Sequence, residues 1–204
     1  IFTAFIAMAL VAVTWFAIRQ PETLDPAQRI RFSPRRIAKG ALEVCSIRVS
    51  FGYSIAAGFK FGSFIGYLNS AQQIFQGLYG LGARFPLFFG LAAFSIGSAL
   101  FFNARLVMRF GMRLLTRQAL TGISVLSSFY FAVAWAVNGS PPFWSLMVYF
   151  MVTFFGFGIL FGNLNAIAME PLGHIAGVGA AVVGSLSTLI SVPVGILIGQ
   201  FYDE

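Results

Sequence analysis

Long apolar segments separated by short polar turns account for most of the chain. A transmembrane helix needs about 20 mostly apolar residues, whereas a strand of a membrane barrel alternates polar and apolar positions over about ten. The apolar segments show no such alternation, so the pattern predicts an all-α fold: a polytopic helical membrane bundle with six transmembrane helices. The predicted spans are residues 1–18, 49–72, 86–107, 114–137, 143–169 and 174–201.

The composition narrows the class of protein further. Of the 204 residues 58% are hydrophobic and 9% are charged, whereas a soluble domain carries about 25% charged residues. So few charges cannot cover a water-facing surface, which excludes a soluble enzyme, a nucleic-acid-binding module and a disordered segment. The expected partner is therefore the lipid bilayer. With one cysteine, Cys45, and one histidine, His174, we expect no disulfide, no metal site and no cofactor.

The positive charges are concentrated in two connecting segments. All Lys and Arg side chains except Lys60 and Arg84 fall within residues 19–48 or residues 105–117. Alternating spans place both segments on one side, and an excess of Lys and Arg marks the cytoplasmic side. The segment 19–48 is thus predicted to be a basic cytoplasmic linker, in which Ser33-Pro34 is typical of the start of a helix along the membrane surface. The clusters are explained by topology and lipid headgroups, with a regulatory or partner site as the alternative.

Rows of small residues predict where helices touch. Lipid provides no hydrophobic drive for helices to associate, so close contacts need small side chains. Two spans carry such residues at four-residue spacing, and Pro193 is expected to kink the last span because it removes a backbone hydrogen bond. The residues predicted to pack are Gly58, Gly62 and Gly66 in one span and Gly177, Ala181 and Ser185 in the other, where Ser187, Ser191, Gly195 and Gly199 form a second row.

Lys60 is the residue most indicative of function, because it lies near the middle of a span. A charge at the bilayer centre costs at least about 2.5–3.5 kcal/mol, so such residues face a bundle interior or an aqueous cavity. The alternative, extension to the headgroups, works best near helix ends. Tyr53, Lys60 and Tyr67 are seven residues apart and share one face with Phe64, opposite the glycines. We therefore predict that this face lines a substrate cavity.

The span 143–169 is the second candidate wall, since it is rich in aromatic residues and ends with Asn163 and Asn165. Such a wall suits flat apolar ligands, although aromatic side chains that face lipid or pack against helices are the alternative. At the next turn, Glu170 is expected to pair with Arg105, Arg109 or Arg113 as a cytoplasmic gate, while His174 is interpreted as a helix-start residue.

The chain resembles the C-terminal part of a major facilitator superfamily transporter, specifically the bicyclomycin and chloramphenicol resistance branch of the twelve-helix drug:proton antiporters. The likeness rests on residues 22–24, 58–70, the run from Asn103 through Arg113, and above all 163–177, which reads NLNAIAMEPLGHIAG. The resemblance implies that the spans correspond to helices six to eleven, with residues 1–18 a truncated helix, 19–48 the linker between halves and 49–204 a partial C-terminal half. The chain begins and ends beside apolar segments, so we expect a fragment.

The resemblance also implies roles for particular residues. Helices seven and ten line the central cavity of the family, which places Lys60, Tyr67, Tyr149 and Asn163 at the cavity. The cytoplasmic loop motif is represented by Arg105, Arg109, Gly111 and Arg113, with Met108 where the motif has Asp. The implied partners are a small-molecule substrate and the missing N-terminal half, and the implied location is the plasma membrane, namely the inner membrane of a bacterium.

The leading hypothesis is a multidrug-efflux type of exporter that moves small apolar or amphipathic compounds by alternating access, driven by a proton gradient. The first alternative is a carrier of an anionic or zwitterionic metabolite with Lys60 as its counter-charge. A membrane-embedded enzyme is disfavoured because no Asp, Glu or His cluster lies within the spans. A scramblase is disfavoured because it would present a polar groove to lipid.

Overall fold

The computed structural model describes residues 2–21 and 33–201. Residues 22–24, which carry part of the resemblance, and Arg29 and Arg31 of the predicted linker lie outside the described residues. The chain forms two compact units, Ile1–Arg35 and Arg36–Glu204. The first contains α1 (Phe2–Arg19), an apolar helix in which the Arg19 guanidinium lies 5.3 Å from the ring centre of Trp15.

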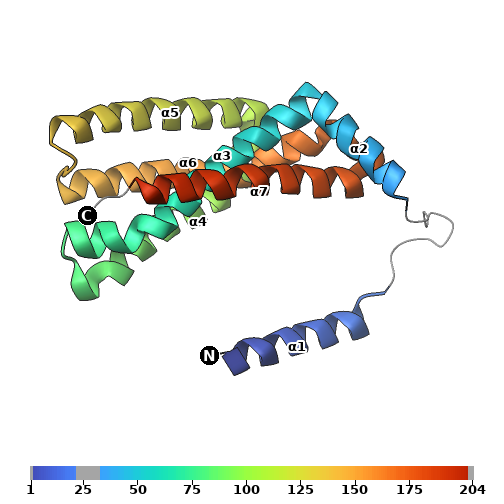
Figure 1. Cartoon of the computed structure of the whole chain (residues 1–204), viewed down its shortest axis with the longest axis horizontal. Coiled ribbons are helices and arrows are strands. Elements are labelled where there is room, and N and C mark those ends of the chain that lie inside the picture. The colour runs from blue at the N-terminus through green and yellow to red at the C-terminus, as the bar shows by residue number, and fades with distance from the viewer. Residues whose placement is uncertain (1, 22–32, 202–204) are drawn as a thin grey trace. The chain divides into compact units, whose positions relative to one another are not determined.

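The second unit is a bundle of long helices without a β-strand in the described part of the chain (Figure 1). It begins with α2, which starts at the predicted Pro34, just before the division between the units. Three short segments interrupt the order: a π-helical turn, Gln73–Leu78, a 3-10 helix, Gly82–Arg84, and a second 3-10 helix, Glu170–Ile175, here named the α6–α7 turn. The helices are α2 (Pro34–Ser46), α3 (Arg48–Gln72), α4 (Phe85–Phe110), α5 (Met112–Ala136), α6 (Phe143–Met169) and α7 (Ala176–Gln200).

These helices coincide with the predicted spans, and the predicted class, a helical membrane bundle, is confirmed. Four continuous helical stretches are long and apolar enough to cross a membrane: Phe2–Arg19, Gly82–Phe110, Met112–Ala136 and Phe143–Gln200, the last containing both α6 and α7. The 25-residue α3 is not in this set because Lys60 and its many Gly and Ser residues lower its hydropathy.

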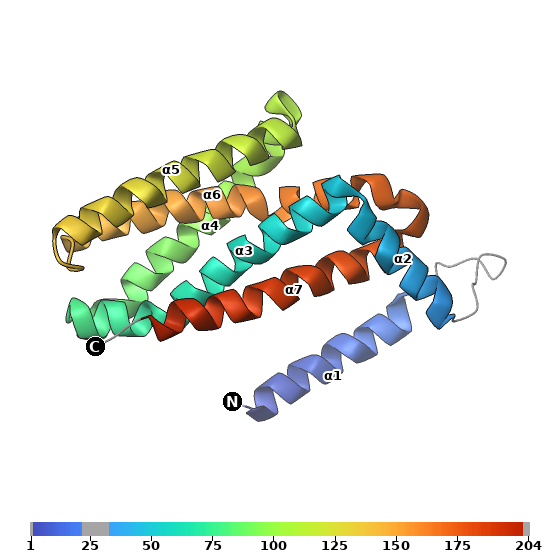
Figure 2. The same cartoon turned by 45° about the horizontal axis from the view of Figure 1, so that its top comes forward.

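The helix α6 holds the bundle together, since it packs against α3, α4 and α5. The helix α3 lies between α6 and α7 (Figure 2). At one end of the bundle, α2 meets the start of α7, where Gly40 allows the side chain of Val178 to approach closely. At the other end, the Tyr79 hydroxyl donates a 2.6 Å hydrogen bond to the carbonyl oxygen of Pro141.

The glycine face of α3 forms a close contact with α7. A Cβ atom placed on Gly58 would lie 2.7 Å from Cβ of Ile190, and one on Gly62 would lie 2.7 Å from Cβ of Val194. The contact continues at Gly66, which faces Ile198. Because these contacts advance in step along both helices, α3 and α7 run parallel. Each missing side chain thus makes room for a β-branched side chain of α7.

The two rows of small residues on α7 have different surroundings. Ser191 and Gly195 of the second row are buried, and Ser187 donates a 3.1 Å hydrogen bond to the carbonyl oxygen of Ser54 on α3. In contrast, the predicted row of Gly177, Ala181 and Ser185 is exposed in the described structure, and no atom approaches within 4 Å of a Cβ on Gly177. The helix α7 is continuous through Pro193, which is also exposed.

Replacing Gly62 by valine should destabilise the intact protein by about 1–3 kcal/mol, because the new side chain would overlap Val194 and overpacking carries a cost of that size. The measurement is the thermal unfolding midpoint of the detergent-solubilised protein. Gly90→Val is the matched control, since nothing lies within 4 Å of a Cβ at Gly90 on α4. Equal shifts for the two variants would contradict the proposed role of the glycine face.

Candidate functional site

Lys60 lies in the contact between α3 and α6. The glycine face of α3 packs against α7, so the opposite face, which carries Lys60, is directed toward α6. The residue is only 8% exposed, and its Nζ atom lies 3.6 Å from the ring centre of Phe161 on α6 and 5.7 Å from that of Phe61. The two rings meet edge-on, with centres 6.2 Å apart, and are 39% and 38% exposed. No hydrogen bond or ion pair to Lys60 occurs among the residues that the structure describes. The ammonium is therefore surrounded by aromatic faces that attract a cation.

Tyr67 lies further along the same face of α3 but is part of an aromatic cluster. Its ring stacks on Phe89 with centres 6.0 Å apart and meets Phe154 edge-on at 4.6 Å and Phe150 at 5.1 Å. Phe64 is edge-on to Phe154 at 6.0 Å. The hydroxyl of Tyr67 is buried and has no hydrogen-bond partner in the described chain. The structure thus brings Lys60, Phe64 and Tyr67 together on one face, with most of Tyr67 packed between helices.

The other predicted cavity residues lie elsewhere. Tyr149 stacks on Tyr130 of α5 with ring centres 4.3 Å apart, and its hydroxyl lies 3.1 Å from Oγ of Ser127. It therefore belongs to the contact between α5 and α6. Tyr53 is half-buried and lines a groove between α3 and α5. No hydrogen bond or cation–π contact joins either tyrosine to Lys60 in the described structure.

Asn163 forms a reciprocal amide pair with Asn103 of α4. The side-chain nitrogen of Asn103 donates to Oδ1 of Asn163 at 3.1 Å, and that of Asn163 donates to Oδ1 of Asn103 at 3.0 Å. Asn163 is 3% exposed, so its amide serves the contact between α4 and α6. Nearby, Ser95 donates a 2.6 Å hydrogen bond to the backbone oxygen of Met151. Polar groups therefore hold α4 to α6 where lipid supplies no hydrophobic drive.

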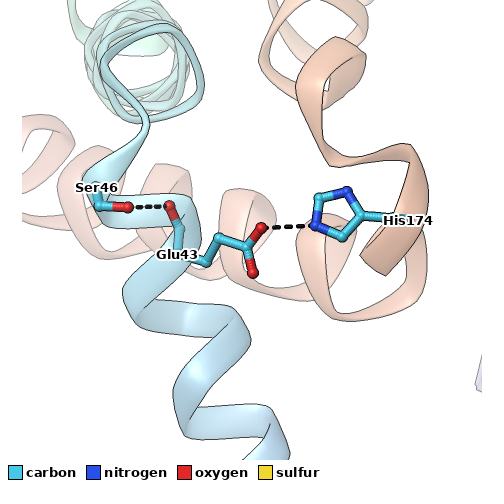
Figure 3. Close-up of polar contacts among 3 residues, drawn as sticks. All are labelled: Glu43, Ser46 and His174. Atoms are coloured by element: carbon cyan, nitrogen blue, oxygen red, sulfur yellow. Dashed lines mark hydrogen bonds and ion pairs between the residues drawn. The ribbon is translucent and has the colours of Figure 1, made fainter.

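The α6–α7 turn is held by ion pairs to two other helices. Glu170 accepts a 2.9 Å hydrogen bond from Arg113 of α5. His174 lies on the other side of the turn, and its Nε2 atom is 2.6 Å from Oε1 of Glu43 on α2. Figure 3 shows the Glu43 carboxylate reaching the imidazole, while Ser46 bonds the backbone oxygen of Glu43. All four partners are partly exposed.

The rest of the predicted loop motif does not take part in these pairs. The Arg105 guanidinium lies 5.7 Å from the ring centre of Phe101, and that of Arg109 lies 5.2 Å from the ring centre of Phe110. Gly111 connects α4 to α5 with φ at +79°, a conformation that favours glycine. Of the three arginines considered for Glu170, Arg113 is the one that pairs with it in the structure.

Sequence reasoning missed several partners of these residues. Phe61, Phe161, Asn103 and Glu43 were not singled out for the contacts that they make. Glu43 and His174 are 131 residues apart, and Asn103 and Asn163 are 60 residues apart. Their pairing depends on which helices are neighbours, and the apolar pattern of a single span does not contain that information.

The fold and the site thus define a class of protein: a helical membrane bundle with a buried lysine. Two known proteins are similar in sequence to this chain. The chain is 26% identical over 205 residues to YdgK of Bacillus subtilis, described as an uncharacterized MFS-type transporter, covering 98% of the chain and 49% of that protein. It is also 26% identical over 198 residues to a bicyclomycin resistance protein homolog of Haemophilus influenzae, covering 96% of the chain and 48% of that protein.

These relatives confirm the predicted resemblance to the major facilitator superfamily and to its bicyclomycin resistance branch. The chain spans about half the length of the curated relatives that it matches. No family model matches the chain, and no solved structure matches it.

Leucine at either Asn103 or Asn163 should destabilise the intact protein by about 1–2 kcal/mol, because the remaining amide would be left without a partner in a buried contact. The double variant should lose much less than the sum of the single variants. Thermal unfolding of the four proteins in detergent measures this coupling.

Asn165→Leu is the matched control for this cycle, since Asn165 is exposed on α6 and has no hydrogen-bonded partner within residues 33–201. It should leave the unfolding midpoint nearly unchanged. If the losses of stability of the two single variants simply added up in the double variant, the hydrogen bonds between Asn103 and Asn163 would make no contribution of their own to stability.

Proposed function

We propose that this chain forms much of the C-terminal half of a secondary transporter that exports small apolar or amphipathic compounds in exchange for protons. The proposal is supported by similarity to two transporters over almost the whole chain, one of which is named for resistance to an antibiotic. A bundle of membrane helices with a charged group in its interior is consistent with it. The remainder of the binding site and the proton-carrying groups would be supplied by the rest of the protein.

Lys60 is the observation that carries the proposal. A mid-membrane ammonium without a carboxylate partner in the described chain is expensive, so its retention points to a use. The rings of Phe61 and Phe161 beside it remain partly exposed. A flat apolar compound would stack on these rings, and an acceptor group on the compound would receive a hydrogen bond from Nζ of Lys60. Apolar contact and one directional polar contact are the usual elements of a small-molecule site.

The second candidate function is transport of an anionic or zwitterionic metabolite. The specific observation in its favour is the same ammonium, because no Asp or Glu lies beside it in the described residues. An anionic substrate would then be the counter-charge of Lys60. The two functions differ in whether the positive charge or only a hydrogen-bond donor is needed.

Alternating access would require the contacts at the α6–α7 turn to change between states. An exposed ion pair such as Glu170–Arg113 is worth only about 0–1 kcal/mol, and the Glu43–His174 contact, which is an ion pair only when the imidazole is protonated, is exposed as well. They can therefore break and form without a large change in stability. In this proposal they bias the balance between the inward-open and outward-open states.

Lys60→Gln in the intact transporter should reduce uptake of an anionic substrate into inverted vesicles at least tenfold, because the counter-charge is lost. If the leading function holds, a neutral drug should lose transport with Lys60→Ala and retain part of it with Lys60→Gln, which still donates a hydrogen bond. Lys39→Ala is the matched control, since Lys39 is exposed on α2. Unchanged transport of both kinds of compound by Lys60→Ala would exclude Lys60 from the site.

Glu170→Gln should raise the labelling rate of a cysteine introduced at Asn165 about two- to fivefold, because losing a pair worth up to about 1 kcal/mol favours the state in which this end is open. The experiment uses a Cys45→Ser background. Arg113→Gln should have the same effect, and combining the two changes should add nothing. Labelling rates that are independent of both residues would argue against a gate at this position.

A further inference from the structure

A groove of about 690 Å³ opens between the first turns of α3 and α5. Its lining includes Arg48, Arg113 and Arg117 together with an apolar wall. The site with Lys60 does not include any of these arginines. The lining residues are Arg48, Gly52, Tyr53, Ala56, Arg113 and Leu114, followed by Thr116, Arg117, Leu120 and Thr121.

The charge in this groove is only partly neutralised. Arg113 is paired with Glu170 at 2.9 Å. Arg48 and Arg117 have no ion-pair partner among the residues that the structure places. The helix ends add to the positive potential, because α3 begins at Arg48 and α5 at Met112, and neither has a side-chain cap. The groove therefore presents cationic donors at the end of the bundle where both helices begin.

The groove is lined by polar residues near the starts of α3 and α5 and by apolar residues further along these helices. Thr116 is fully buried, and its Oγ1 atom has no hydrogen-bond partner in the described structure, whereas Thr121 bonds the backbone oxygen of Arg117. The apolar part of the wall includes Ala56 and Leu120, which lie further into α3 and α5 than the three arginines. Nothing lies within 4 Å of a Cβ at Gly52, so the space beside α3 is open.

We propose that this groove binds an anionic phospholipid, with the headgroup phosphate held by Arg48 and Arg117 and the acyl chains lying along Ala56 and Leu120. Guanidinium groups bind phosphate through paired hydrogen bonds, and basic residues near the cytoplasmic leaflet attract anionic lipids. The apolar wall favours a lipid over a free phosphate ion, because an inorganic ion would leave that wall without a partner. The proposal requires that the bundle lies in a membrane with this end at a leaflet that contains anionic lipid, and it does not depend on the transported compound.

The test is native mass spectrometry of the intact protein after incubation with equal amounts of phosphatidylglycerol and phosphatidylcholine. The wild type should retain phosphatidylglycerol preferentially. The double variant Arg48→Gln/Arg117→Gln should lose this preference about 25-fold, since each arginine near an anionic headgroup contributes about fivefold. Arg48→Lys/Arg117→Lys should retain an intermediate preference, because it keeps the charge without the paired hydrogen bonds.

Arg109→Gln is the matched control, because it removes one charge from the last turn of α4, outside the groove. It should leave the preference unchanged. Equal losses in Arg109→Gln and the groove variants would show a diffuse surface charge and overturn the proposal. Retention of the preference by the double variant would also overturn it, as would complete displacement of the lipid by millimolar inorganic phosphate, or no preferential binding by the wild type.

Discussion

The close approach of α3 to α7 is the constraint on which the rest of the bundle depends. Lipid offers no hydrophobic drive for two helices to associate, so the contact must come from packing. Gly58, Gly62 and Gly66 leave room for a row of β-branched side chains on α7, and this fixes the rotation of α3 about its axis. The opposite face, with Lys60 and Tyr67, is then directed toward α6. The position of the buried Lys60 ammonium is thus a consequence of the positions of the glycines on α3.

A close contact at a helix glycine occurs a second time, between α6 and α4. Gly158 of α6 lies where a Cβ would be 2.6 Å from Cβ of Ala99 on α4, just as Gly62 faces Val194. The local sequences agree, since residues 61–71 and 157–167 carry Phe, Gly, Gly, Leu and Asn in the same register. Repeated units of this kind are typical of transporter folds. Lys60 of α3 and Phe161 of α6 lie in the contact between the two helices that carry the repeated sequence.

The sequence was sufficient for the helices, the glycine face and the interior position of Lys60, because each is a property of one span. It could not determine which row on α7 packs against α3, since both have small residues and the outcome depends on where Ile190, Val194 and Ile198 fall. Asn163 was predicted to line a cavity because the resemblance places its helix there, but one span does not reveal a polar partner on another helix, and in the structure the amide of Asn163 pairs with that of Asn103. The repeat was a signal that could have indicated two equivalent helix pairs.

Neutral polar groups and charged groups occupy different parts of this bundle. Neutral amides and hydroxyls hold α4 to α6 in the interior, where an unpaired group costs most and the contact is expected to persist. Charged pairs lie at the exposed end, where water can replace a partner at little cost. Lys60 departs from both patterns, since it is charged and interior, lies beside the rings of Phe61 and Phe161 and has no ion-pair partner in the described chain. A charged group without an ion-pair partner in the described chain is one whose energy a substrate or a moving helix can change, which supports the proposed site.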